Sequence, residues 1–272
     1  FDSHAWRLAW TLTTFHLRRG LWNDQATAQR AGLEAARRIG DTAGEAHALH
    51  GLALGYARSG RIRDAYLHLR HALLKFRRTG DNVNQANVHC SITLLSSGRQ
   101  RHADALRHST RALGLYRAAG HRLGQARALN NIGFSHAKLG DYEQAITYCQ
   151  RGLAANQRSG EHSWEACTWD SLGYIHQELG NSQQAIACYE RSLDLARNLA
   201  DSPCEAATLD QLGDVHYSVG DIEAARRAWT RALRILDDID HPDGDRVRAR
   251  LHRHGGPPSA VDRPYVAAVA SA

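Results

Sequence analysis

Histidine and cysteine are the residues of this sequence with the greatest capacity for chemistry. The chain contains 17 His and 5 Cys. Histidine binds metals and transfers protons, and four histidines fall at the same position of a forty-residue period: His16, His136, His176 and His216. One Zn²⁺ needs all its ligands within about 2.3 Å, whereas equivalent residues of packed helices lie about 8–10 Å apart or more. We therefore expect these histidines to pack at seams between helices and not to bind a metal.

The cysteines form no catalytic or disulfide pattern. Their number is odd and no Cys-x-x-Cys pair occurs, which argues against a disulfide framework and favours a reducing cytoplasm. His89 and Cys90 are adjacent, and adjacent residues of a helix do not face each other. Gly-x-x-x-x-Gly-Lys-Ser/Thr, Gly-x-Gly-x-x-Gly and His-Glu-x-x-His motifs are all absent from the sequence. We expect no enzyme activity, no cofactor and no metal site.

Glycine and proline indicate the elements that must position the remaining polar residues. Proline is absent from the first 202 residues, and four of the 5 Pro lie at or beyond Pro242. Because proline breaks helices, this distribution favours an all-helical chain. Nine glycines mark helix ends at nearly every twentieth residue: Gly20, Gly40, Gly60, Gly80, Gly120, Gly140, Gly160, Gly180 and Gly220. Each pair of helices between them forms one forty-residue hairpin.

Aligning the sequence at this period superimposes small residues on both helices of a hairpin. The first helix carries Gly133, Gly173 and Gly213, and the second carries Ala145, Ala185 and Ala225. Small residues on facing helices let the backbones approach closely, while bulky neighbours fill the flanks. One hairpin cannot bury its apolar stripe alone, so the hairpins must stack.

Over roughly residues 2–239 this pattern resembles the tetratricopeptide repeat. The resemblance implies an all-α fold, a right-handed α-solenoid of about six forty-residue tetratricopeptide-like helical hairpins with a C-terminal capping helix. We expect the solenoid to cover residues 1–254, with a disordered tail at 255–272. The six hairpins are expected at 2–40, 41–80, 81–120, 121–160, 161–200 and 201–240, with the capping helix at 242–253.

Two of these hairpins depart from the repeat pattern. The first hairpin has Thr13 and Gln25 where small residues are expected, and the third hairpin has Gln100 in place of the glycine. The polar residues of the third hairpin make it a candidate hinge. Acidic residues follow several of the glycines, and we expect N-caps at Asp41, Asp81, Asp141 and Asp221.

In tetratricopeptide solenoids the first helix of each hairpin lines the concave face, and the resemblance places fourteen residues in a partner-binding groove. Trp10, Phe134, Tyr174 and Tyr217 are the expected anchors, and the amides of Asn130 and Asn131 are suited to hold a peptide backbone. Three aspartates would make the C-terminal end acidic. The full set is Trp10, His47, His50, Asn87, Arg127, Asn130, Asn131, Phe134, Asp170, Tyr174, Gln177, Asp210, Asp214 and Tyr217. The alternative is that these residues only solvate an idle surface.

The net charge of +6 is divided unevenly along the chain. Residues 1–120 hold 18 basic and 8 acidic residues, whereas residues 121–240 hold 11 and 17. A basic region suggests nucleic acid, but the inward positions vary between units and turn acidic, so direct RNA or DNA binding is the least favoured alternative. No apolar run of about 18 residues exists, so we expect no membrane partner.

Particular segments are similar to the C-terminal repeats of AfsR-like antibiotic regulatory proteins of actinobacteria. They are Ala5-Trp6-Arg7-Leu8-Ala9-Trp10, Trp169-Asp170-Ser171-Leu172-Gly173-Tyr174 and His241-Pro242-Asp243. The chain begins with Phe1 and contains no Met, so we expect a fragment of a longer protein. The resemblance implies a winged-helix DNA-binding domain, an activation domain and an ATPase before it.

On this resemblance the chain is a non-enzymatic interaction and sensor module that regulates transcription of antibiotic biosynthesis. Its partner would be a peptide, a protein or its own upstream domains, held in the concave groove. The alternative is a cytoplasmic receptor for a small molecule or signalling peptide that acts by tightening the superhelix.

Overall fold

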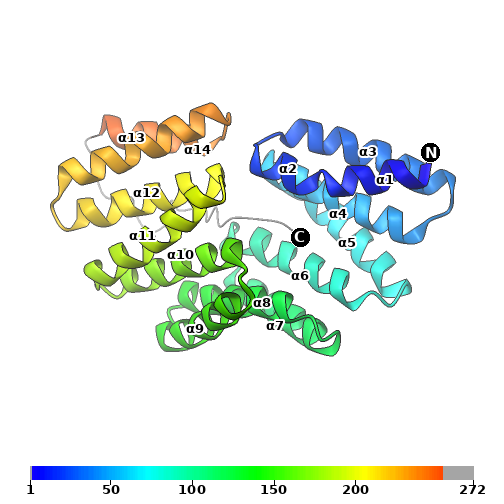
Figure 1. The fold of residues 1–272 in the computed structure, drawn as a ribbon, viewed down its shortest axis with the longest axis horizontal. Coiled ribbons are helices and arrows are strands. Elements are labelled where there is room, and N and C mark those ends of the chain that lie inside the picture. The colour runs from blue at the N-terminus through cyan, green and yellow to red at the C-terminus, as the bar shows by residue number, and fades with distance from the viewer. Residues whose placement is uncertain (1, 254–272) are drawn as a thin grey trace. The chain divides into compact units, whose positions relative to one another are not determined.

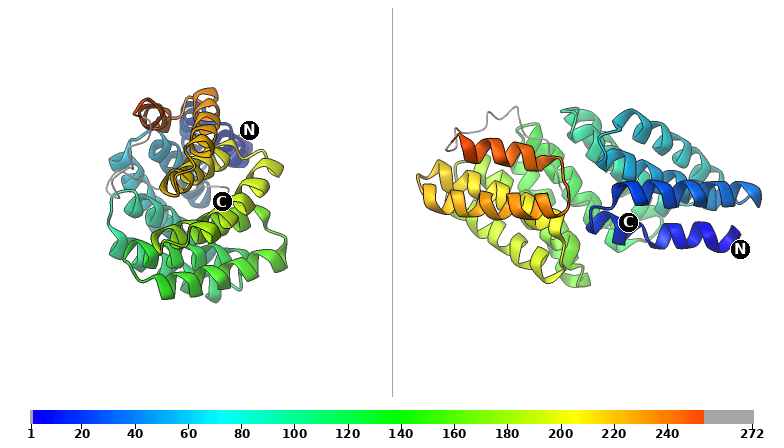
Figure 2. Two further views of the ribbon diagram at one scale, coloured as in Figure 1. Left: turned by 90° about the vertical axis from the view of Figure 1, so that its left-hand side faces the viewer. Right: turned by 90° about the horizontal axis from the view of Figure 1, so that it is seen from above.

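The computed structural model describes residues 2–253, and this part of the chain folds entirely into helices, turns and short connections without a strand (Figure 1, Figure 2). The helices are α1 (Asp2–Thr11), α2 (Thr13–Arg18), α3 (Trp22–Arg38), α4 (Thr42–Arg58), α5 (Ile62–Arg78), α6 (Asn82–Ser97), α7 (His102–Ala118), α8 (Arg122–Lys138), α9 (Tyr142–Ser159), α10 (His162–Glu178), α11 (Ser182–Asn198), α12 (Ser202–Ser218), α13 (Ile222–Asp238) and α14 (Asp243–His252). The predicted class of repeated helical hairpins is confirmed. The expected disordered tail at 255–272 lies outside the described residues.

The described residues form two compact units. Unit 1 comprises residues 2–96 and 104–128, and unit 2 comprises 97–103 and 129–253. In unit 1 one apolar core joins α3, α4, α5 and α6. In unit 2 one core joins α8 to α11 and a second joins α11 to α14. We call α4, α6, α8, α10 and α12 the A helices, and α3, α5, α7, α9, α11 and α13 the B helices.

Left-handed residues punctuate the chain every twenty positions. All nine glycines predicted as helix ends have positive φ, and the gaps in that series are filled by Gln100, Ala200 and Asp240 at φ 58°, 51° and 49°. Non-glycine residues adopt this region at a cost. The bonds from Gly40 N to Arg37 O (3.2 Å) and from Asp41 N to Ala36 O (2.9 Å) form the double closure of a Schellman motif. The twenty-residue period is therefore a period of backbone conformation, and Gln100, Ala200 and Asp240 maintain it without glycine.

Side chains that accept a hydrogen bond from the first turn begin many of the helices. The four predicted caps, Asp41, Asp81, Asp141 and Asp221, each accept from the amide three residues later. Two further residues cap in the same way and were not predicted. Asp201 accepts from Cys204 N at 3.1 Å, and His121 Nδ1 accepts from Gly124 N at 2.9 Å.

Glycine on the A helices makes room for the B helix of the same hairpin. A Cβ added at Gly133 would lie 2.9 Å from the backbone oxygen of Ala145, whereas one added at Gly213 would meet the Trp229 indole at 2.4 Å. The predicted close approach of small residues is therefore confirmed for α8 and α9. In the last hairpin a buried bulky side chain occupies the space instead.

The first hairpin differs from the expected single helix followed by its partner. Its first helix is interrupted at Leu12, between α1 and α2. The buried amides of Gln25 and Gln29 both donate to Thr13 Oγ1, and Gln29 also donates to Ala9 O at 2.6 Å. Polar residues at these positions thus bond to the first helix, whereas the equivalent residues of the next hairpin are the buried apolar Ala65 and Leu69.

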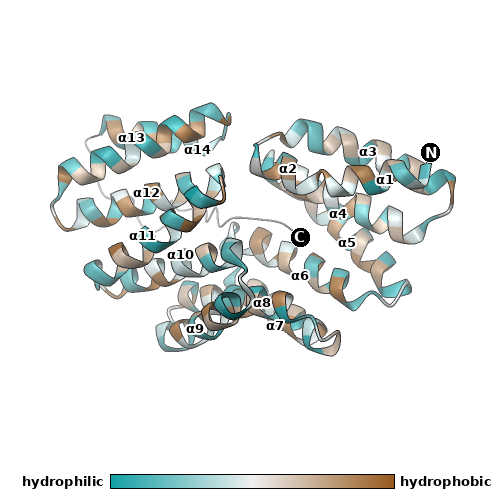
Figure 3. Cartoon of the chain, in the orientation of Figure 1, coloured by the Kyte–Doolittle hydropathy of each residue, from teal (hydrophilic) through white to brown (hydrophobic). Residues whose placement is uncertain are grey.

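None of the helices in residues 2–253 has the length and apolar character needed to cross a bilayer. Figure 3 shows hydrophilic and hydrophobic residues interspersed along single helices, as in α13. That pattern is typical of helices that bury one face only.

Candidate functional site

The predicted groove residues all lie on α1 or on A helices, but most of their surface is already buried. Five keep partial exposure: Trp10, His47, Asn87, Gln177 and Tyr217. The other nine are buried. Buried polar groups need hydrogen-bond partners, so the contacts of these residues determine which of them are open to a ligand.

In unit 1 an aromatic cluster joins α1 to α4. The Trp10 ring lies 4.6 Å from the His47 ring and 5.9 Å from the His50 ring, centroid to centroid. His50 Nε2 shares a hydrogen bond of 2.9 Å with Ser91 Oγ on α6. Burial lowers the pKa of His50 to about 3, so this imidazole stays neutral at physiological pH.

A buried arginine joins the next two A helices of unit 1. Arg127 on α8 donates to Asn87 Oδ1 on α6 and to the Tyr116 hydroxyl on α7. Tyr116 OH also donates to Asn87 Oδ1 at 2.5 Å. Burial raises the pKa of the Tyr116 phenol, so the phenol remains protonated and donates.

In unit 2 an aromatic pair with a lysine joins α8 to α10. The rings of Phe134 and Tyr174 lie 5.5 Å apart, and Lys138 Nζ lies 3.7 Å from the centroid of the Tyr174 ring. Such a cation–π contact holds the ammonium beside the ring face. Two of the four predicted anchors therefore meet, and they do so with Lys138, which is not among the fourteen predicted residues.

The two adjacent amides of α8 have different environments. Asn130 Oδ1 accepts from the Cys149 thiol at 3.7 Å. The Asn131 side chain is 7% exposed, and its Nδ2 has no hydrogen-bond partner among the described residues. Residues 131, 134 and 138 share one helical face, so this amide lies on the same face as Phe134 and Lys138. A buried donor without a partner is destabilising unless a ligand accepts from it.

Asp170 on α10 is the centre of a network with α12. Its Oδ1 accepts from Gln211 Nε2 at 2.9 Å and from Thr208 Oγ1 at 3.2 Å. The Tyr189 hydroxyl donates to Gln177 Oε1 and Gln211 Oε1 at 3.1 and 3.2 Å. Burial raises the pKa of Asp170 to about 6, against the effect of both hydrogen bonds and of Lys138, which lower it.

Replacing Asp170 with asparagine should remove part of the pH dependence of stability. The folded chain holds this proton to higher pH than the unfolded chain, whose pKa is near 3.8. The contribution of Asp170 is therefore greatest below about pH 4 and is lost as the pH rises through about 6. As the pH rises between those limits, the free energy of unfolding of Asp170→Asn should increase by on the order of 2 kcal/mol relative to that of the unsubstituted chain. Urea unfolding at pH 4.5 and 7.5 measures this, with exposed Asp194→Asn as the control. Parallel pH profiles for Asp170→Asn and the unsubstituted chain would contradict the assignment.

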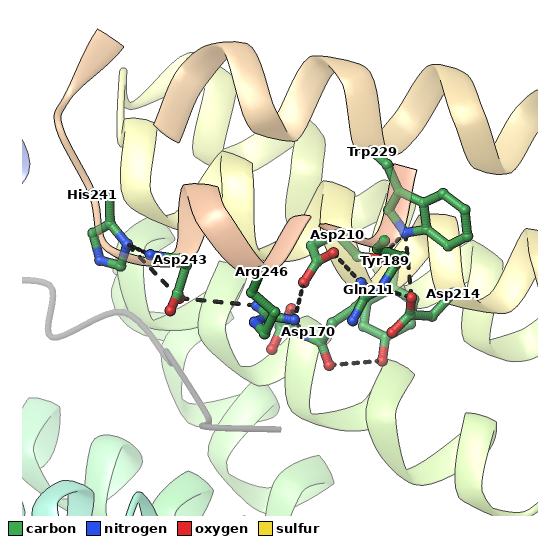
Figure 4. A network of polar contacts seen from close by, with 10 residues as sticks. Asp170, Tyr189, Asp210, Gln211, Asp214, Trp229, His241, Asp243 and Arg246 are labelled. Atoms are coloured by element: carbon green, nitrogen blue, oxygen red, sulfur yellow. Dashed lines mark hydrogen bonds and ion pairs between the residues drawn. The ribbon is translucent and has the colours of Figure 1, made fainter. Parts of the chain in front are cut away.

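The predicted acidic end of the groove is corrected by the structure, because α14 supplies arginines to it (Figure 4). Arg246 Nη1 lies 2.8 Å from Asp210 Oδ2. Arg250 Nη1 pairs with Asp210 and lies 2.8 Å from Asp214 Oδ1. Trp229 Nε1 also donates to Asp214 Oδ1 at 3.2 Å. Asp210 and Asp214 hold the capping helix in place and do not present a free acidic surface.

Four contacts of the predicted residues share one sequence separation. The two residues of each pair lie about forty positions apart: His50 and Ser91, Asn87 and Arg127, Asp170 and Gln211, and Asp210 and Arg250. Polar contacts at this separation thus join α4 to α6 and α6 to α8 in unit 1, and α10 to α12 and α12 to α14 in unit 2. The repeat length itself is the signal that would have identified these pairs.

The histidines and cysteines contact their neighbours within the helix packing. His136 stacks on Tyr148 with ring centroids 5.5 Å apart, and His16 Nδ1 lies 3.0 Å from Gln25 Oε1. All five cysteines are buried free thiols, and burial raises the pKa of Cys149 to about 12. Within residues 2–253 no three His, Cys, Asp or Glu side chains come close enough to hold a metal ion.

A family model for the tetratricopeptide repeat matches the chain at residues 85–158, 124–198 and 164–238. Together these overlapping segments cover more than half of the sequence. A search of curated proteins found no match.

Several solved structures share the fold at low sequence identity. BtubC from P. vanneervenii is 21% identical with a TM-score of 0.60, and the match covers 90% of this chain and 98% of that one. NprR in complex with its cognate peptide NprX is 17% identical with a TM-score of 0.67, covering 92% and 71%. A signal transduction ATPase with a tetratricopeptide repeat sensor, from Pyrococcus horikoshii, is 16% identical with a TM-score of 0.60; this chain spans 38% of it. Identities this low establish the common fold alone.

Proposed function

We propose that this chain, which belongs to the tetratricopeptide repeat family, binds an extended peptide segment along the A helices of unit 2. The observation that carries the proposal is Asn131, whose buried Nδ2 donor lacks a hydrogen-bond partner among the described residues. A peptide carbonyl is the acceptor that would satisfy it.

The surroundings of this donor suit a peptide. Phe134 and Tyr174 are neighbouring aromatic residues, 3% and 8% exposed, and the ammonium of Lys138 lies beside both rings. Gln177, on the same helix as Tyr174, is partly exposed and is anchored by the Tyr189 hydroxyl. The solved relative NprR was determined with its cognate peptide, which supports a peptide as the class of ligand.

Asn131→Ala should weaken peptide binding at least about tenfold while leaving the fold intact. Because the substitution removes an unsatisfied buried donor, the free energy of unfolding should stay the same or rise. Octapeptides selected from a random phage-displayed library against the unsubstituted chain would be synthesised and titrated by calorimetry. Asn198→Ala, an exposed asparagine at the end of α11, is the matched control.

Two results would contradict this site. The first is a selected peptide that binds Asn131→Ala and the unsubstituted chain with equal affinity. The second is a library that yields no peptide with measurable affinity for the unsubstituted chain.

We further propose that peptide binding regulates a longer transcription regulator of the AfsR-like group. The support is the similarity of the segments at 5–10, 169–174 and 241–243. The solved relative in which a repeat sensor accompanies an ATPase offers a parallel architecture. Sequencing the coding region before Phe1 tests this, and an open reading frame without an ATPase would contradict it. The groove of fourteen residues stays a prediction, except at Asp210 and Asp214, whose carboxylates pair with arginines of α14.

A further inference from the structure

Helix α5 carries an exposed apolar ridge that the packing of the hairpins does not require. Leu67 and Leu74 are 47% and 53% exposed, and they lie seven residues apart on one line of the helix. Both leucines point away from the core residues of the same helix, Leu69 and Phe76, which are fully buried. The ridge is therefore additional to the amphipathic pattern that holds α5 in unit 1.

The other B helices lack this ridge at the equivalent positions. Forty-residue steps from Leu67 reach Thr27, Arg107, Thr147, Ala187 and Arg227, and the same steps from Leu74 reach Glu34, Gly114, Ala154, Asp194 and Arg234. Every one of these residues is small or polar. The repeat thus tolerates any side chain at these positions, and leucine at both is a property of α5 alone.

Arginines flank the ridge on both sides. Arg63, Arg70 and Arg77 follow one another at seven-residue intervals, and Arg78 lies on the other side of Leu74. All four are exposed, and no acidic residue in the described part of the chain pairs with them. The one acid of α5, Asp64, pairs with Arg61 at 2.7 Å. The face from 63 to 78 therefore combines two leucines with four uncompensated positive charges.

We propose that this face of α5 is a docking surface for an acidic amphipathic helix of a partner protein. Leucines one heptad apart pair with apolar residues at the same interval on a second helix, and the flanking arginines select Glu and Asp beside them. Sixteen residues of helix span about 24 Å, so a partner helix of about four turns covers the face. This surface shares no residue with the proposed peptide site at Asn131.

Two other occupants fit the observations less well. Nucleic acid would use the arginines, but two exposed leucines add nothing to contact with phosphates. A second copy of this chain would need an acidic helix with a leucine ridge, and the equivalent positions of the other B helices do not provide one. Binding of a DNA duplex and dimerisation of the chain are therefore measured alongside peptide binding.

The probe is a synthetic fluorescein-labelled 21-residue helical peptide with Leu at seven-residue intervals and Glu at the flanking positions. One comparison peptide has Lys in place of Glu, and another has Ala in place of Leu. Binding to the full chain is measured by fluorescence anisotropy at 50 and 300 mM NaCl. We expect the Glu/Leu peptide to bind at least tenfold more tightly than either comparison peptide, with affinity falling at the higher salt.

The variants separate the ridge from general positive charge. Leu67→Ser with Leu74→Ser, and separately Arg70→Glu with Arg77→Glu, should each weaken the Glu/Leu peptide at least tenfold. Arg227→Glu with Arg234→Glu changes exposed residues on α13, at positions equivalent to the two leucines, and should leave binding unchanged. All substituted residues are exposed, and circular dichroism checks that each variant is folded. Asn131→Ala should not affect this binding.

Three results would overturn the proposal. The first is equal loss of affinity in the α13 control, which would indicate nonspecific charge attraction. The second is a 20-base-pair DNA duplex that binds more tightly than the peptide and is insensitive to the leucine substitutions. The third is a dimer in sedimentation that the leucine substitutions dissociate, which would make a second copy the occupant.

Discussion

Arg250→Ala should destabilise unit 2 by about 3–5 kcal/mol, because it leaves two buried carboxylates without their closest cation. The side chains of Arg250, Asp210 and Asp214 are 5–6% exposed in the ion pairs they form. A buried carboxylate that loses its charge partner carries a desolvation cost that the guanidinium had offset. Urea unfolding followed by circular dichroism measures the loss. Amide hydrogen exchange should rise first in α12, α13 and α14, because repeat proteins open at their ends.

The matched control is Arg248→Ala on the same helix. Arg248 is 43% exposed and pairs with Asp237 and Asp245, so its loss should change the free energy of unfolding by no more than about 0.5 kcal/mol. Combining Arg250→Met with Asp214→Asn should recover at least half of the Arg250→Ala loss, since it removes the charge of Asp214 together with that of its partner Arg250, whereas Asp210 keeps Arg246 at 2.8 Å. A loss below about 1 kcal/mol for Arg250→Ala would show that the pairs do not hold α14 in place.

The helix ends at every twentieth residue were predictable, because most of them are marked by glycine. Glycine at φ near 70° is a local requirement, and the sequence displays it directly. Gln100, Ala200 and Asp240 were not predictable in this way, because their residue types do not favour the left-handed region. Each adopts it because the flanking helices pack as they do in the hairpins that have glycine at this position. The break at Leu12 depends likewise on what Gln25 and Gln29 bond to across the hairpin.

The helices that carry the candidate residues were predictable, but the contacts of those residues were not. Position along the repeat correctly placed Asp170, Asp210 and Asp214 on the A helices. It did not show that Arg246, Arg250 and Gln211 would bond to them, because such pairs form between residues about forty positions apart. Burial of Asn131 without a partner has no signature in the sequence, since it depends on the position of every neighbouring side chain. Asparagine at position 131 indicates a side-chain donor, but only the packing shows that this donor has no hydrogen-bond partner among the described residues.

Gly133→Leu should destabilise the chain by at least about 3 kcal/mol, whereas Gly114→Leu should stabilise it by about 0.5 kcal/mol. The two changes are chemically identical and both occur within helices. A Cβ at Gly114 meets nothing within 4 Å, so leucine there gains helix propensity alone. A Cβ at Gly133 would lie 2.5 Å from Cys149 Sγ and 2.9 Å from Ala145 O, so α8 and α9 must separate.

The contact with the backbone oxygen of Ala145 can be tested separately from the contact with the Cys149 side chain. Cys149→Ala removes the sulfur but leaves the carbonyl oxygen of Ala145 in place, so it should rescue Gly133→Leu only in part. Urea unfolding of the single and double variants measures the rescue. Complete rescue would show that the sulfur alone requires glycine at 133. Partial rescue would establish that the two backbones meet there, and that their separation sets the spacing between the A helix and B helix of that hairpin.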